Sequence, residues 1–225
     1  MTLPNRVLPT GEIVAVPLRG TFMGNRGILH GADRTLGPAR WRHPHWICCV
    51  LSFKDRHRAP MTPGRYTELF FLDEAVALAA GHRPCAECRR ADYLRFLDAW
   101  ERAHGDRPRT AGIDRVLHAV RVEPRTRRQR RHEVDLATLP DGTFVLHADA
   151  PALVRGDRLH PFGPGAYRPP IPRPRSGAVQ VLTPAPLVAV LHAGYPVALH
   201  PSVTLQHELA PPQALHAAGQ APDTL

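Results

Sequence analysis

The order of hydrophobic and polar positions predicts a mixture of short strands and amphipathic helices. Apolar runs at residues 12–18, 46–53 and 66–72 contain β-branched or aromatic side chains and are typical of strands. Between residues 93 and 100, and again between 113 and 120, apolar side chains recur at i, i+3, i+4 and i+7. This spacing places them on one face of a helix. The pattern therefore predicts the α+β fold class.

A short helix is predicted directly after the third strand. Asp73 is a suitable N-cap, because its carboxylate can accept a hydrogen bond from an N–H of the first turn. Residues 74–80, EAVALAA, follow it, and Gly81 stands where a helix commonly ends with a left-handed residue. Two cysteines, Cys85 and Cys88, come next at C-x-x-C spacing.

The second half of the chain has a different pattern, in which short β-type runs alternate with Pro- and Gly-containing turns. A last short helix is predicted over residues 183–194. The predicted organisation is a mixed α+β domain over 1–120 that contains a small strand–helix–C-x-x-C zinc module at about 43–105, an arginine-rich loop at 121–134, a Pro-rich, mainly β segment at 135–205 and a poorly ordered tail at 206–225.

The chain is strongly basic, with 29 Lys and Arg against 20 Asp and Glu and a formal net charge of +9. Lys54 is its only lysine. Such a dominance of arginine over lysine is also what a GC-rich genome produces through codon bias. The charge still has a physical consequence, since it attracts nucleic acid or another polyanion at low salt.

Arginine is densest in RVEPRTRRQRRHEV, residues 121–134. Guanidinium groups pair with two phosphate oxygens at once, so this segment is a candidate arm for DNA or RNA. The candidate contacts are Arg125, Arg127, Arg128, Arg130 and Arg131. The alternative is a solvated loop, and no aromatic side chain is interleaved to stack on bases.

A second, weaker candidate for anion binding is GTFMGNRG, residues 20–27. Its glycine spacing is that of a turn rather than of a dinucleotide-binding loop. Together with Arg19 and Arg26, this turn could line an anion site.

No stretch approaches the ~20 apolar residues that cross a bilayer. The N-terminal residues carry no apolar core of a signal peptide. We therefore expect a cytoplasmic protein with no membrane partner. In that compartment stable disulfides are rare, so the four cysteines are expected to bind metal, to act catalytically or to be buried.

A zinc ion needs four ligands, and the C-x-x-C pair supplies two of them. The only other cysteines are Cys48 and Cys49, which point to opposite faces if they lie on a strand. Alternation favours Cys49, which shares a face with Ile47, Leu51 and Phe53, the side expected to pack on the domain. The alternatives are a redox-active dithiol and ordinary buried thiols.

The predicted fourth ligand is His45, which stands on the face of Cys49 four positions earlier. In a straight strand this separation is ~13 Å, so Pro44 or a local turn must fold the histidine back. His43 and His57 are the rival histidines.

The run FFLDEAVALAAGHRPCAEC resembles the strand–helix–knuckle of Ada-like zinc modules, found in bacterial DNA-repair proteins and in small domains attached to nucleases and competence proteins. The resemblance covers about twenty residues and implies Zn²⁺ on Cys85 and Cys88. Some of the smaller domains use H-x-x-x-C upstream, and His45 and Cys49 have that spacing. Ada-type modules carry a second, separated cysteine pair upstream, and one cysteine of that pair accepts a methyl group. This chain has vicinal cysteines instead, so methyl acceptance is not implied.

The expected function is that of a cytosolic zinc-binding protein with a structural metal and a nucleic-acid contact. One alternative is a metal-dependent hydrolase, nuclease-like, with an open zinc position or a general base such as His57 near Asp55. A second alternative is a protein–protein adaptor. A zinc deaminase is excluded because the H-x-E that must precede P-C-x-x-C is absent.

Overall fold

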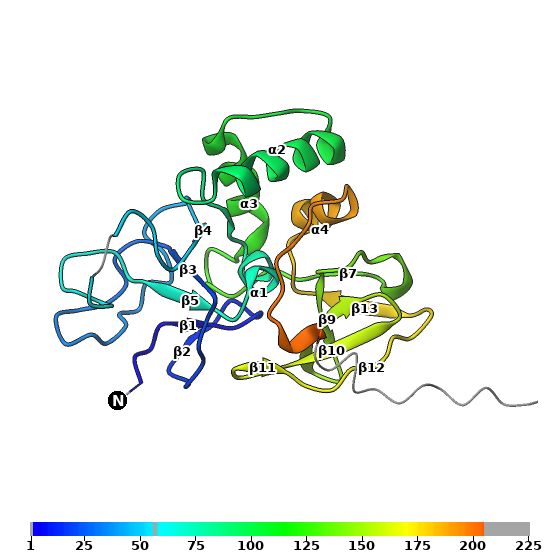
Figure 1. Ribbon diagram of the computed structural model, residues 1–225, viewed down its shortest axis with the longest axis horizontal. Helices are drawn as coiled ribbons and strands as arrows, with labels where there is room; N and C mark the ends of the chain where they lie inside the picture. The colour runs from blue at the N-terminus through cyan, green and yellow to red at the C-terminus, as the bar shows by residue number, and fades with distance from the viewer. Residues whose placement is uncertain (1, 56–57, 205–225) are drawn as a thin grey trace, which may run out of the picture.

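The computed structural model describes residues 2–55 and 58–204 and contains two β-sheets with helices between and above them (Figure 1). The first sheet has the strand order β2-β1-β5-β3-β4-β6. Its strands are β1 (Arg6–Val7), β2 (Ile13–Val14), β3 (Phe22–Asn25), β4 (Ile47–Cys49), β5 (Leu69–Phe71) and β6 (Arg83–Pro84). Most of its pairs are antiparallel, but β6 is parallel to β4 and forms an edge of the sheet.

The second sheet is antiparallel and has the order β11-β10-β9-β8-β13-β7, with β12 paired to β10. Its strands are β7 (His132–Asp135), β8 (Phe144–His147), β9 (Ala150–Arg155), β10 (Arg158–Gly163), β11 (Ala166–Tyr167), β12 (Ile171–Pro172) and β13 (Ala178–Val181). A short 3₁₀ turn, η1 (Leu136–Thr138), follows β7. The β-rich nature of this half agrees with its Pro- and Gly-punctuated pattern.

Helix α1 (Glu74–Ala79) is the centre of the molecule, and all of its residues are buried. Apolar side chains of both sheets, including Phe71 and Phe144, share one core with Val76 of this helix. Asp73 caps the helix by accepting a hydrogen bond from Val76 N at 3.0 Å, and Gly81 follows it with φ of +82°. The predicted cap and end of this helix are thus confirmed.

The remaining helices are α2 (Arg90–His104), α3 (Thr110–Arg121) and α4 (Ala185–His192). They share a second core, to which the two predicted apolar stripes contribute Phe96, Trp100, Ile113 and Leu117. In the described ranges every helix is too short or too polar to cross a bilayer. The tail predicted at 206–225 lies outside the described residues.

Two buried carboxylates hold the segment after α4 against α1. Asp73 accepts hydrogen bonds from the Tyr167 hydroxyl at 2.8 Å and from His200 N at 2.9 Å. Glu74 accepts from the Tyr195 hydroxyl at 2.6 Å and forms a buried ion pair with Arg89 at 2.8 Å. The last described part of the chain is therefore fastened to the helix that precedes the C-x-x-C turn.

Candidate functional site

The parallel pair of β4 and β6 brings the two cysteine segments together. In its register Ile47 lies beside Arg83 and Cys48 beside Pro84, and Cys85 N donates to Cys48 O at 2.9 Å. The next position along both strands therefore sets Cys49 beside Cys85. Arg89 N donates to Cys85 O at 3.2 Å, which closes the knuckle ahead of α2.

The sulfur atoms of Cys49, Cys85 and Cys88 all lie within 4.8 Å of one another. Ligand sulfurs around a tetrahedral zinc, with Zn–S bonds of ~2.3 Å, are ~3.8 Å apart. Small side-chain rotations that move the sulfur atoms by less than about 1 Å would thus suffice to place all three sulfurs on one ion. These three residues fit a metal centre.

Of the two vicinal cysteines, Cys49 is the one that lies in the sulfur cluster, but the structure corrects the reason given for preferring it. Cys48, not Cys49, is on the core side of β4: Cys48 is fully buried, whereas Cys49 is partly exposed and Leu51 is 51% exposed. Cys48 packs in the main core and accepts a hydrogen bond from Arg89 at 3.4 Å. Cys49 reaches the knuckle because it points away from that core.

The three thiols are electrostatically coupled. Hydrogen bonds from Cys49 and Cys88 lower the pKa of Cys85 to about 2. Cys49 is the donor in its hydrogen bond to Cys85, and this bond raises the pKa of Cys49. Without a cation, one thiolate is therefore held by two neighbouring thiols. A metal ion that replaces their protons would let all three act as ligands.

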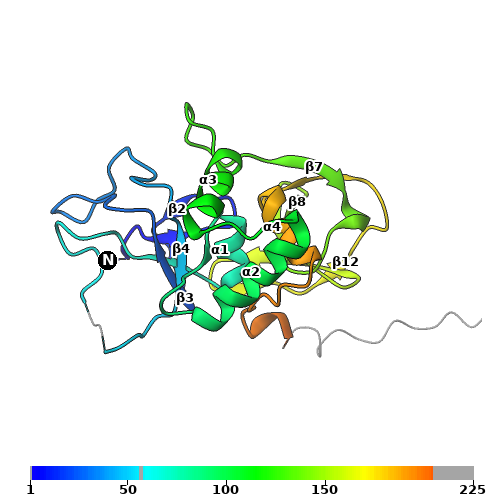
Figure 2. The same ribbon diagram turned by 90° about the horizontal axis from the view of Figure 1, so that it is seen from above.

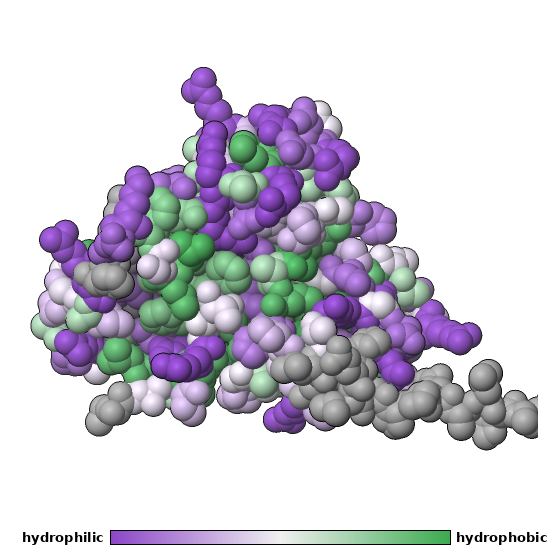
Figure 3. Space-filling view, in the orientation of Figure 1, coloured by the Kyte–Doolittle hydropathy of each residue, from purple (hydrophilic) through white to green (hydrophobic). Residues whose placement is uncertain are grey.

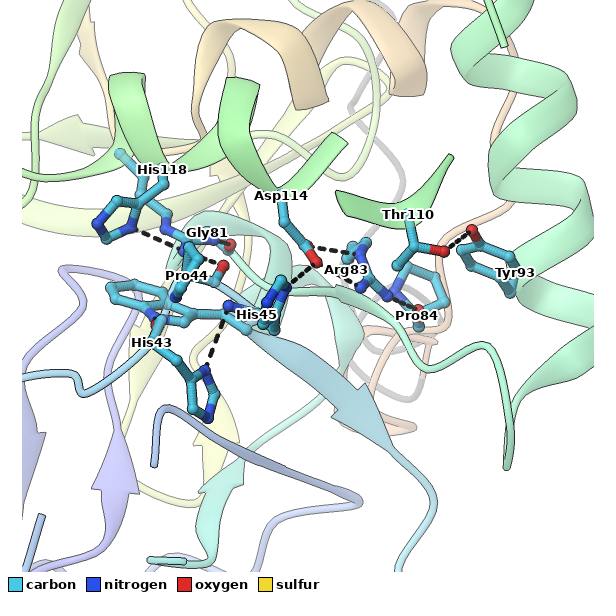
Figure 4. Close-up of polar contacts among 12 residues, drawn as sticks. His43, Pro44, His45, Gly81, Arg83, Pro84, Tyr93, Thr110, Asp114 and His118 are labelled. Atoms are coloured by element: carbon cyan, nitrogen blue, oxygen red, sulfur yellow. Dashed lines mark hydrogen bonds and ion pairs between the residues drawn. The ribbon is translucent and has the colours of Figure 1, made fainter. Parts of the chain in front are cut away.

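His45 is placed differently from the prediction. Its Nδ1 lies 2.7 Å from Oδ2 of Asp114, a fully buried carboxylate that Arg83 also contacts with two nitrogens at 2.7 and 2.8 Å (Figure 4). Among the described residues the sulfur cluster includes no histidine. The chain between His45 and Cys49 thus does not fold the imidazole back towards the sulfur cluster. Asp114 on α3 binds the imidazole instead.

Of the two rival histidines, the structure describes only His43, which is not part of the sulfur cluster. His43 Nδ1 accepts a hydrogen bond from His45 N at 3.2 Å (Figure 4). His57 lies outside the described residues.

The arginine-rich segment forms a turn between α3 and β7. Glu123 N donates to Arg128 O at 2.8 Å and Arg130 N to Arg121 O at 3.0 Å. Seen from above, this turn projects beyond the helices (Figure 2). All five predicted arginines, Arg125, Arg127, Arg128, Arg130 and Arg131, line one cavity of about 1180 Å³.

Three further arginines line the same cavity: Arg26, Arg40 and Arg121. Arg26 was a candidate from its Gly-rich turn, whereas Arg19 of the same candidate is not among the lining residues. Arg121 closes α3 and is the first residue of the arginine-rich segment, although it was not among the five candidate contacts. Arg40 lies on a long loop, and no local motif marks it. Their convergence depends on contacts between distant segments. The cluster of three cysteines is separate from this cavity, since no cysteine is among the lining residues.

Comparison of the chain with protein-family models, with curated proteins and with solved structures finds no significant match in any of the three sets.

Proposed function

We propose that this protein binds one zinc ion through Cys49, Cys85 and Cys88, that the ion has a structural role, and that the protein contacts nucleic acid through its arginine-rich turn. The observation that carries the proposal is the convergence of three sulfur atoms within 4.8 Å from two segments of the chain. A strand and a knuckle brought together by a parallel pairing supply three of the four ligands of a typical zinc site.

Zinc is the metal that best fits this donor set. Soft thiolate ligands select zinc, copper(I) or iron–sulfur clusters rather than magnesium or calcium. The resemblance of residues 70–88 to Ada-like modules supports the same metal. It also supports the pairing of a C-x-x-C knuckle with an upstream strand.

A structural role follows from where the cluster lies. Strand β6 has two residues and pairs only with β4 among the described strands, so it has few hydrogen bonds of its own. A metal bound at Cys49, Cys85 and Cys88 would join this edge strand and the start of α2 to the sheet. Closed zinc sites of this kind contribute directly to folding.

The nucleic-acid contact is supported by the charge of the turn. Of its five predicted arginines, only Arg130 lies within ion-pair distance of a carboxylate in the described part of the chain, that of Glu123 at 3.0 Å. The other four guanidinium groups are free of acidic partners there and can meet phosphate oxygens. Binding of this type releases counterions and weakens steeply with salt.

The metal proposal is tested by elemental analysis of untagged protein and of matched cysteine variants. We expect about one zinc per chain in the wild type. Cys49→Ser and Cys85→Ser should lose it, whereas Cys48→Ala, the neighbour that faces the core, should keep it. His45→Ala should also keep it, because that imidazole pairs with Asp114. Zinc retained in both ligand variants would refute the proposed centre.

The nucleic-acid proposal is tested by binding of a single-stranded oligonucleotide over a salt series. With five phosphate contacts, the logarithm of the association constant should fall with the logarithm of salt concentration with a slope of about −3.5. A variant with Arg125, Arg127 and Arg128 changed to Gln should weaken binding and flatten that slope. Absence of binding even at low salt would favour the adaptor role.

A metal-dependent hydrolase is the second candidate, and one observation favours it. The described cluster contains three protein ligands, and a catalytic zinc keeps one position for water or substrate. Cobalt(II) substitution distinguishes the two roles. A visible spectrum that changes when azide is added would indicate an open position. An unchanged tetrahedral spectrum supports the structural role.

A further inference from the structure

The cavity beside the arginine-rich turn is far more basic than the turn alone. Eight arginines line it, against two glutamates, Glu12 and Glu123. Glu123 already pairs with Arg130 at 3.0 Å. The arginines come from separate segments of the fold: Arg26 from the turn after β3, Arg40 from a loop, Arg121 from the end of α3 and the rest from the segment that follows α3.

Two of these arginines are buried in the cavity wall. Arg26 is 2% exposed and Arg121 is 1% exposed. Both guanidinium groups lie over the ring of Trp46, at 4.0 and 3.8 Å from its centroid. Trp46 is itself 1% exposed. The aromatic ring thus holds two positive charges next to each other, where they repel.

No carboxylate in the described structure lies within ion-pair distance of either buried charge. Arg26 donates to His82 Nε2, Gly11 O and Ala80 O over long distances of 3.2 to 3.5 Å. These bonds exceed the usual 2.9–3.0 Å. The acceptors are uncharged, since burial and then the charge of Arg26 hold the pKa of His82 well below its usual value.

Arg121 has stronger hydrogen bonds, and Asp114 is the carboxylate that acts on its charge, from beyond ion-pair distance. It donates to Gly81 O at 2.9 Å and to Pro44 O at 2.7 Å, and its third partner is His118 Nδ1 at 3.0 Å. Its Nε has no acceptor among the described residues. Burial lowers the pKa of both guanidinium groups, which reflects how unfavourable their charges are in this place.

A buried charge without a partner is costly, and an anion bound beside it offsets that cost. Guanidinium groups pair with phosphate oxygens in a planar, two-pronged geometry. The partly exposed Trp41 also lines the cavity, with its ring 6.0 Å from that of Trp46. It offers an aromatic face for a nucleobase, which the arginine-rich turn itself lacks.

The depth of the buried arginines decides which phosphate can approach them. A phosphodiester in the middle of a strand carries a nucleoside on each side, and both would have to enter the cavity. A terminal phosphate carries one, and a single nucleotide fits within about 1180 Å³. Gln129 also lines the cavity, and its buried Oε1 has no donor among the described residues.

We propose that this cavity binds the terminal phosphate of a nucleotide, either a free mononucleotide or the end of a nucleic-acid strand, with Arg26 and Arg121 at its floor and Trp41 against the base. The inference rests on the proposed nucleic-acid contact but assigns a different chemical group to a different set of residues. It is independent of the metal.

The test compares labelled 12-residue oligonucleotides that have a phosphate at the 5′ end, a phosphate at the 3′ end or hydroxyl groups at both ends. Binding is measured by fluorescence anisotropy at one ionic strength, with AMP and inorganic phosphate as competitors. We expect one phosphorylated strand to bind at least tenfold tighter than the hydroxyl strand. Competition by AMP identifies free nucleotides as a second source of the group. Its failure restricts the site to strand ends.

Variants connect the effect to the cavity. Arg26→Lys and Arg121→Lys keep the charge but lose the planar fork, and they should remove the tenfold preference. Because either buried change can impair folding, Arg40→Gln at the exposed rim is the second variant, expected to weaken the preference severalfold. Arg95→Gln on α2, which loses the same charge at a 53% exposed side chain away from the cavity, should leave the preference intact.

Two outcomes separate this inference from the proposed function. Equal binding of all three strands, with a normal salt slope, would overturn the terminal-phosphate site and leave the arginine contact standing. Binding of AMP without binding of any strand would support the cavity and overturn the nucleic-acid contact. A preference that persists in the Arg40 and Arg121 variants would also overturn the site.

Discussion

At the scale of single residues, the two vicinal cysteines show how one step along a strand separates two roles. Cys48 fills the main core and Cys49 faces the C-x-x-C knuckle. If β4 presented its other face to the core, Cys49 would be buried there and Cys48 would face the knuckle. The direction of each side chain is set by which face of β4 is covered by α1 and the second sheet, which no local pattern specifies.

Gly81 lies between α1 and the C-x-x-C segment. Because it has no side chain, it leaves room for Arg121, which lines the basic cavity. Gly81 has φ of +82°, and a Cβ there would lie 2.6 Å from Cδ of Arg121. Gly105 at the end of α2 has a similar φ of +77° but no atom within 4 Å of a built Cβ. Substitution of Gly105 therefore measures the cost of backbone strain alone, whereas substitution of Gly81 adds the cost of steric contact with Arg121.

We predict that Gly105→Ala lowers the free energy of unfolding by about 1 kcal/mol, the usual cost of a left-handed residue with a Cβ. Gly81→Ala should cost about 2–4 kcal/mol, because it also displaces Arg121. Urea titration of both variants measures the difference. Equal losses would mean that Arg121 is not packed against this turn.

At the scale of elements, α1 and its flanks were the most predictable part of the fold. The cap residue Asp73, the Ala-rich run and Gly81 are local signals, and each acts within a few residues of itself. Strand pairing is different, because the parallel contact between β4 and β6 depends on a crossover connection of more than thirty residues. The cysteine cluster was accessible from motif spacing, whereas the pairing of His45 with Asp114 and the placement of Arg121 were not.

The N-terminal cap of α1 predicts a pH dependence of stability. Burial raises the pKa of Asp73 to about 6 from its usual value of 3.8. Between these values the folded state binds more protons than the unfolded state, so this group makes stability fall as pH rises from about 4 to about 6. Below that window its contribution is fully present.

Asp73→Asn cannot titrate and loses this dependence. We expect the free energy of unfolding of the wild type, relative to that of the variant, to decrease by up to about 3 kcal/mol between pH 4 and pH 7. Denaturant unfolding of both proteins over this range provides the difference, in which other titrating groups cancel. A difference that is flat or rises with pH would contradict the assignment.

At the scale of the whole molecule, one core joins the two sheets through α1, and buried charged groups such as Glu74 and Arg89 pair within it. Hydrophilic side chains dominate the outline of the face in Figure 3, with hydrophobic ones towards its middle. The metal cluster lies at the carboxyl end of the β4–β6 pair, while Trp46 and Gly81, at its amino end, belong to the surroundings of the basic cavity. A metal bound at the three cysteines would therefore also stabilise this pair of strands, which extends from one region to the other.

Metal removal should loosen this part of the molecule selectively. After chelation under reducing conditions, we expect amide hydrogen exchange at residues 47–49 and 83–92 to accelerate at least tenfold. The second sheet, represented by β8 to β10, should change little because its core is formed without the cysteines. Exchange that accelerates uniformly would indicate global unfolding. Unchanged exchange would exclude a structural metal.

The most direct test of the proposed centre is X-ray absorption at the zinc edge of the purified wild-type protein. We expect three sulfur ligands at ~2.3 Å and one nitrogen or oxygen ligand at ~2.0–2.1 Å. In Cys48→Ala the sulfur count should remain three, and in Cys49→Ser, if any zinc is retained, it should fall to two. Four sulfur ligands in the wild type, or a zinc shell without sulfur, would contradict the three-cysteine centre.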